Sequence, residues 1–80
     1  KLYIGKYEIV PGFILHITLD GEQLYVQATG QPAAKLYAAT DTRFFIKEAN
    51  AQMTFNADAG GKVVSLTLHQ GGDTVAKKIE

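Results

Sequence analysis

The chain has 80 residues, enough for one small hydrophobic core and too few for two. Eight basic residues balance eight acidic ones, so the chain lacks the basic excess of a nucleic-acid-binding protein. Absence of cysteine excludes disulfides and thiolate metal sites, and the apolar runs are too short for a transmembrane helix. We therefore expect a single domain over residues 1–80, with no nucleic acid as partner and no transmembrane segment.

Turn signals recur at nearly regular spacing, and between them lie short runs in which apolar and polar residues alternate. This pattern predicts an all-β fold of about eight short antiparallel strands. The turn signals are Pro11-Gly12, Asp20-Gly21, Gly30-Gln31-Pro32, Asp41, Asn50, Gly60-Gly61 and Gly71-Gly72.

The first strand is expected over Leu2–Val10, and the second begins at Phe13, after Pro11-Gly12. In the second strand every other residue is apolar, which is typical of a half-buried strand. Asp20-Gly21 suits the two central positions of a type I′ hairpin turn. With these two residues as the loop, Ile17 faces Leu24, Leu15 faces Val26 and Phe13 faces Ala28.

The third strand is expected over Gln23–Thr29 and the fourth over Lys35–Ala39. The fourth is the least distinct, because its flanking alanines favour helix as much as strand and leave a one-turn helix as the alternative. Three further strands are predicted over Arg43–Lys47, Gln52–Asn56 and Val63–His69. A two-residue loop at Gly71-Gly72 then sets Leu68 opposite Val75 and Val64 opposite Ile79.

Short connections between successive strands predict an up-and-down meander, and eight strands are enough to close into a small barrel. The fold is thus a closed or partly open barrel. Its interior is expected to be filled by large side chains, which argues against a ligand cavity. The expected interior residues are Leu15, Ile17, Leu24, Val26, Leu36, Phe44, Met53, Phe55, Val64, Leu66 and Leu68.

The candidates for catalysis and metal binding are few. Ser65 and His69 lie four residues apart on one strand, about 13 Å, which is too far for a serine–histidine pair. Nucleophile motifs of the Gly-x-Ser-x-Gly or Ser-x-x-Lys type do not occur. His16 lies on the outward phase of its strand, and no third ligand stands at zinc-site spacing from the histidines. We expect no catalytic residue, no metal site and no cofactor in this chain.

Three aromatic residues are more informative. Tyr25, Tyr37 and Phe45 occupy the outward phase of the third, fourth and fifth strands, and a loop centred on Asp41 sets Tyr37 beside Phe45. A contiguous patch of outward aromatic rings is a usual mark of a contact surface. The alternative is that these rings simply cover a small barrel.

Several segments, taken together and in their order along the chain, form a recognisable pattern. They are Tyr3-Ile4-Gly5-Lys6-Tyr7, the run from Leu24 to Pro32, Phe44-Phe45, Phe55 with Asp58, and the run from Leu66 to Gln70. With these segments the chain resembles a C-terminal domain of unknown function attached to bacterial β-lactamase-related, penicillin-binding-protein-like serine hydrolases. The resemblance covers nearly the whole chain.

The resemblance implies a lipocalin-like barrel excised from the C-terminal end of a larger, exported protein, which places it in the periplasm or outside the cell. The family's nucleophile belongs to a Ser-x-x-Lys motif of the catalytic domain, so no catalytic residue carries over. The implied function is a non-catalytic accessory module that packs on the catalytic domain, shapes access to its cleft or aids oligomerisation. Its partner is then the catalytic domain of the same chain or a second copy. The alternative is a barrel that binds an apolar or peptidic ligand in its mouth.

Overall fold

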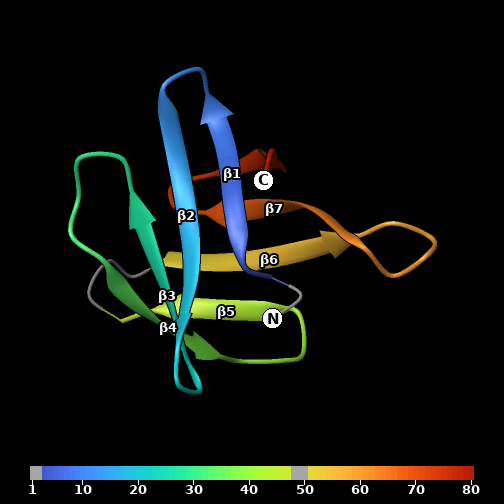
Figure 1. The fold of residues 1–80 in the computed structure, drawn as a ribbon, viewed down its shortest axis with the longest axis horizontal. Coiled ribbons are helices and arrows are strands. Elements are labelled where there is room, and N and C mark those ends of the chain that lie inside the picture. Colours follow the sequence, from blue (N-terminus) through green and yellow to red (C-terminus); the bar gives the residue numbers. More distant parts are fainter. Residues whose placement is uncertain (1–2, 48–50) are drawn as a thin grey trace.

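The computed structural model describes residues 3–47 and 51–80. These residues form eight antiparallel strands in chain order around a closed barrel, with β8 returning to β1 (Figure 1). The all-β barrel predicted from the alternation is confirmed, and closure leaves no free sheet edge. The strands are β1 (Gly5–Val10), β2 (Phe13–Asp20), β3 (Gln23–Ala28), β4 (Ala34–Ala38), β5 (Arg43–Ile46), β6 (Ala51–Ala57), β7 (Val63–His69) and β8 (Asp73–Lys78).

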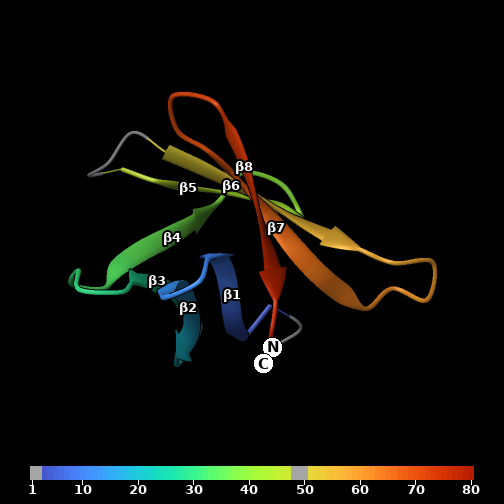
Figure 2. The ribbon, with the colours of Figure 1, turned by 90° about the horizontal axis from the view of Figure 1, so that it is seen from above.

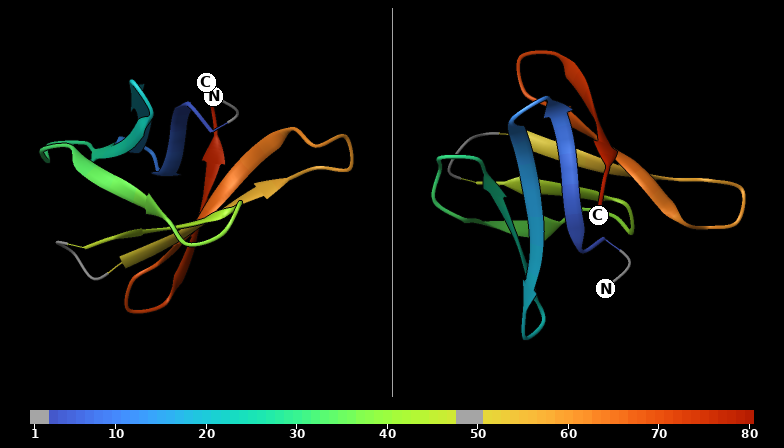
Figure 3. Two further views of the ribbon diagram at one scale, coloured as in Figure 1. Left: turned by 90° about the horizontal axis from the view of Figure 1, so that it is seen from below. Right: turned by 45° about the horizontal axis from the view of Figure 1, so that its top comes forward.

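Strands on opposite walls of the barrel run in different directions. Strands β1 and β2 run across β5 and β6 in Figure 1. The end of β8 lies beside the start of β1, where the barrel closes (Figure 2). The β6–β7 and β7–β8 hairpins project beyond the wall (Figure 3). Within the described ranges, no helix is long and apolar enough to cross a membrane.

The fourth segment is a strand, β4, and the helical alternative for it is wrong. β4 pairs with β3 through Leu24–Leu36 and with β5 through Ala38–Phe44. Leu36 is almost fully buried in the barrel. Pairing on both edges and burial of this side chain outweigh the weak helix preference of the alanines.

The register predicted for the β2–β3 hairpin is wrong by two residues. Asp20 pairs with Gln23, so the loop is Gly21-Glu22, and Ile17 faces Val26 rather than Leu24. Gly21 has a φ of 66°, which suits the first central position of a tight hairpin turn. A shift of two residues preserves the faces, because side chains alternate with period two. The inward positions of this hairpin are therefore as predicted.

The predicted β7–β8 register is wrong by one residue, which does change the face. His69 pairs with Asp73 around a three-residue loop, so Val75 faces Thr67 rather than Leu68. As a result Ala76 is fully buried and Val75 is 59% exposed. Two consecutive glycines allow the longer loop, because both adopt positive φ angles.

A bulge in the β6–β7 hairpin explains why Val64 does not lie in the interior. Asn56 pairs with Ser65 but Ala57 pairs with Val63, so Val64 is an extra residue in its strand. Val63 consequently points inward and is 5% exposed, whereas Val64 is 41% exposed. The prediction that Val64 lies in the core is wrong.

The core divides into two parts along the barrel. One end is filled by an aromatic cluster, in which the Phe55 ring stacks on Tyr3 and meets Tyr7 and Phe44 edge to face. The Tyr3 hydroxyl donates to the Asp41 carbonyl at 2.6 Å and so ties the cluster to the β4–β5 connection. The buried residues are Tyr7, Leu15, Ile17, Val26, Leu36, Phe44, Ile46, Ala51, Met53, Phe55, Val63, Leu66 and Ala76.

Closure of the barrel depends on a short junction between β1 and β8. Tyr7 pairs with Lys78 and Glu8 with Lys77. Beyond β8, the Ile79 amide donates to the Lys6 carbonyl at 2.8 Å. Gly5 (φ 150°) lies so close to the Glu80 carbonyl that a Cβ atom would overlap it. The junction therefore requires glycine at this position.

We predict that Gly5→Ala destabilises the domain more than Gly12→Ala does. Both glycines have positive φ angles, which cost about 1–3 kcal/mol for a residue with a side chain. Only Gly5 also has a close neighbour, because nothing lies within 4 Å of a Cβ atom built at Gly12. Chemical denaturation of the two variants measures the difference. Equal losses of stability would show that the contact with Glu80 is unimportant.

A second prediction concerns alkaline pH. Burial, with a smaller contribution from Tyr3, raises the pKa of Tyr7 to about 12. Between about pH 10 and 12 the folded state keeps the proton that the unfolded state releases, so stability falls as pH rises, by at most about 3 kcal/mol. The Tyr7 hydroxyl also donates to the Tyr3 carbonyl at 2.9 Å. Tyr7→Phe should therefore cost about 1 kcal/mol at neutral pH and flatten the alkaline decline. Parallel declines of melting temperature in both proteins would contradict this assignment.

Candidate functional site

The structure brings together two of the three aromatic residues predicted to form a contact surface. Tyr37 on β4 pairs with Phe45 on β5, and their rings stack with centroids 5.6 Å apart. Both rings lie on the outside of the barrel and are half-buried. The loop centred on Asp41 thus positions this pair as the sequence indicated.

Tyr25 lies on the same outer face but does not pair with Tyr37. Lys35 stands directly opposite it across the β3–β4 ladder, which leaves Tyr25 and Tyr37 as diagonal neighbours. A second lysine is near the pair, since the Lys47 ammonium lies 4.4 Å from the centre of the Tyr37 ring. The outer aromatic patch (Tyr25, Tyr37 and Phe45) therefore carries positive charge at its edges.

A hydrogen-bonded chain on the outside of β6–β8 was missed by sequence reasoning. The His69 ring bonds the Thr54 hydroxyl through Nε2 at 2.9 Å and the Asp73 carboxylate through Nδ1 at 2.8 Å. A carboxylate accepts hydrogen bonds only, so Nδ1 carries a proton, and in the neutral ring Nε2 accepts from the hydroxyl. This is the order of groups in a hydroxyl–imidazole–carboxylate triad, with threonine in place of serine.

Ser65 takes no part in that chain, as its separation from His69 predicted. Its hydroxyl accepts from the Asn56 amide at 3.1 Å, and the same amide donates to Thr67 at 3.0 Å. Thr54 lies in the strand ladder with Arg43 opposite on one side and Thr67 on the other. A polar ladder of paired side chains thus covers this wall. The signal available in the sequence was the spacing of His69 and Asp73 across two glycines.

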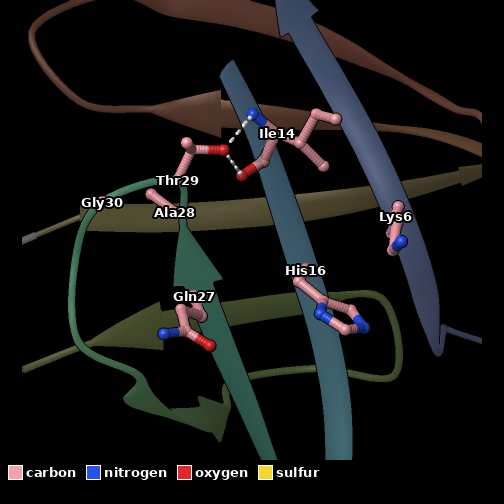
Figure 4. A pocket seen from close by; sticks show the side chains of 7 residues that line it. All are labelled: Lys6, Ile14, His16, Gln27, Ala28, Thr29 and Gly30. Carbon is pink, nitrogen blue, oxygen red and sulfur yellow. Dashed lines mark hydrogen bonds between the residues drawn. The ribbon is translucent and has the colours of Figure 1, made fainter. Parts of the chain in front are cut away.

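His16 is exposed on the outside of β2, as its outward phase predicted. Lys6 and Gln27 flank it on the adjacent strands, and together they border a shallow pocket of about 280 Å³ (Figure 4). At the edge of this pocket the Thr29 hydroxyl bonds both the amide and the carbonyl of Ile14. Among the described residues no group of three potential ligands is placed to hold a metal ion.

Among the described residues, the barrel is open at the end opposite the aromatic cluster. A cavity of about 420 Å³ enters there, bordered by the β3–β4 connection and by Gln70 after β7. Three alanines contribute to its wall, Ala28, Ala34 and Ala51, and none of the described lining residues is charged. The expectation of a barrel filled by large side chains therefore holds at one end only.

Two comparisons with known proteins find similarity to this chain. A family model described as "Domain of unknown function (DUF3471)" matches residues 1–78. Penicillin-binding protein 4* of Bacillus subtilis (strain 168) is 30% identical over 53 residues, which is 66% of this chain. The aligned stretch spans only 12% of the length of that relative. No solved structure matches the chain at a significant level.

Proposed function

The chain belongs to the DUF3471 family, and from this we propose that it is a non-catalytic accessory module of a β-lactamase-related serine hydrolase. The observation that carries the proposal is the similarity to a small part of a much longer penicillin-binding protein. A barrel with its own core has the size of such an appended module. We place it at the C-terminal end of its parent and outside the cytoplasm, as the resemblance implies.

The outer aromatic patch supplies the surface for this role. Tyr37 and Phe45 form a stacked pair on the outside of two adjacent strands, Lys47 lies over the Tyr37 ring, and Lys35 lies opposite Tyr25. Such a surface fits a partner with an apolar centre and acidic groups around it. We propose the catalytic domain of the same parent chain as that partner.

We predict that Phe45→Ala and Tyr37→Ala each weaken binding to the catalytic domain by about 2 kcal/mol or more, while the barrel stays folded. Phe44→Ala is the matched control for the first variant, because Phe44 is the adjacent phenylalanine on the inward face and is 8% exposed. Its loss should leave a cavity and cost about 3–5 kcal/mol of stability.

Titration calorimetry and thermal unfolding measure the two effects separately. If Tyr37→Ala unfolds the barrel while Phe44→Ala does not, the assignment of faces is inverted and docking through this patch is wrong. If the patch variants abolish self-association instead, the partner is a second copy of the chain.

We also predict that the domain alone hydrolyses neither β-lactams nor simple esters and peptides. The chain of Thr54, His69 and Asp73 lies on the strand ladder of the outer wall, and acyl transfer further requires a bound substrate and aligned oxyanion donors. A chromogenic cephalosporin and a nitrophenyl ester provide the measurement. Turnover that disappears in Thr54→Val but persists in Thr67→Val would overturn the non-catalytic role, and Ser65→Ala tests the remaining hydroxyl in the same way.

A further inference from the structure

We propose that the open end of the barrel binds an uncharged, mainly apolar small molecule, of the size of a short alkyl chain or a small aromatic ring system. The proposal goes beyond docking on the catalytic domain, because it concerns the inside of the barrel rather than its outer face. It depends on the space at this end, the chemistry of its wall and the way the opposite end is closed.

The space results from small residues at inward positions. Ala28, Ala34 and Ala51 come from β3, β4 and β6, and each contributes a methyl group where the other end of the barrel has aromatic rings. The cavity of about 420 Å³ lies within the range of roughly 300–1,000 Å³ that ligand pockets occupy. A dry apolar cavity of about 150 Å³ already holds benzene. The open end thus has room for a larger ligand.

The wall selects for apolar, uncharged groups. Leu15, Val26 and Met53 line the cavity, and each is at most 5% exposed. A charged group placed among these side chains would lose its hydration without finding an ion pair among the described lining residues. Gln31 and Gln70 add amide groups, which suit a neutral hydrogen-bonding atom. An apolar body with at most one neutral polar group matches this distribution.

The aromatic cluster makes the cavity a blind pocket rather than a channel. Phe44 and Phe55 pack edge to face with centroids 5.5 Å apart, and Tyr3 covers both rings. Among the described residues, the open end is therefore the route by which a ligand enters and leaves. Walls from β2 to β7 give the cavity a concave shape, which favours a small molecule over the flat surface of a protein partner.

The single methionine of the chain allows a test without mutation. Met53 lines the cavity and is 1% exposed, so a carbon-13 label on its methyl group gives one NMR signal from the wall of the site. The probe is N-phenyl-1-naphthylamine, an uncharged fluorophore whose emission rises in apolar surroundings. We expect saturable fluorescence and a shift of the Met53 signal over the same concentration range. Decanol should displace the probe.

A matched pair of variants locates the binding. Ala34 and Ala38 lie on the same face of β4, since strand side chains alternate with period two, but only Ala34 lines the cavity. Ala34→Leu should fill the site and weaken probe binding at least about tenfold, without lowering the melting temperature. Ala38→Leu, the same change at the far end of the strand, should leave binding within about twofold of the unmodified protein.

Three outcomes would overturn the proposal. One is the absence of saturable binding or of a Met53 shift. Another is probe binding that survives Ala34→Leu but is lost in Tyr37→Ala, which would move the ligand to the outer patch. The third is a Met53 shift that appears only with the catalytic domain, which would make the open end part of that interface. If Ala34→Leu fails to fold, the Met53 signal of the unmodified protein still shows whether the probe binds at the cavity wall. None of the probe measurements requires the catalytic domain, so their failure leaves the docking proposal intact.

Discussion

The junction between β1 and β8 is the constraint on which the rest of the molecule depends. Eight strands form a barrel only if the last returns to the first, and here two paired positions and the Ile79–Lys6 hydrogen bond make that closure. The bare backbone of Gly5 lets the C-terminal residues approach. Tyr7, one residue of the junction, is also fully buried in the core, so closure and core packing stabilise each other. Closure then separates an inside from an outside, and each surface can take a different role.

The side chains inside the barrel differ in size along its axis. Four rings fill one end, and the other end has alanine at three wall positions. The packed end contributes much of the apolar burial that a domain of 80 residues needs, since small domains bury little surface in proportion to their size. The outside is divided as well, with stacked aromatic rings on β4 and β5 and hydrogen-bonded polar side chains on β6 and β7.

The sequence allowed the faces of most strands to be predicted, but the register only of some strand pairs. Alternation alone identified Leu15, Ile17 and Leu66 as inward, because side-chain direction is a local property of a strand. Register depends on the loop, and the β2–β3 and β7–β8 hairpins have loops other than those predicted, whereas Pro11-Gly12 joins β1 to β2 as expected. The wrong register at Gly21 did not change which residues face inward, because a shift of two residues keeps the faces. The bulge at Val64 did change them, because one extra residue reverses the alternation. No local signal in the sequence marked this bulge.

The same distinction explains which parts of the candidate sites could be predicted. Tyr37 and Phe45 were found because a short loop joins their strands, so their adjacency follows from nearby residues. The bond between Thr54 and His69 depends on the register of β6 against β7, and the cavity depends on alanines from three strands of a closed barrel. Both are properties of closure rather than of any single segment. The outer patch and the open end are formed by different faces of the strands, because side chains alternate between the outside and the inside of the barrel. The same alternation allows a substitution such as Phe45→Ala to change one surface without changing the other.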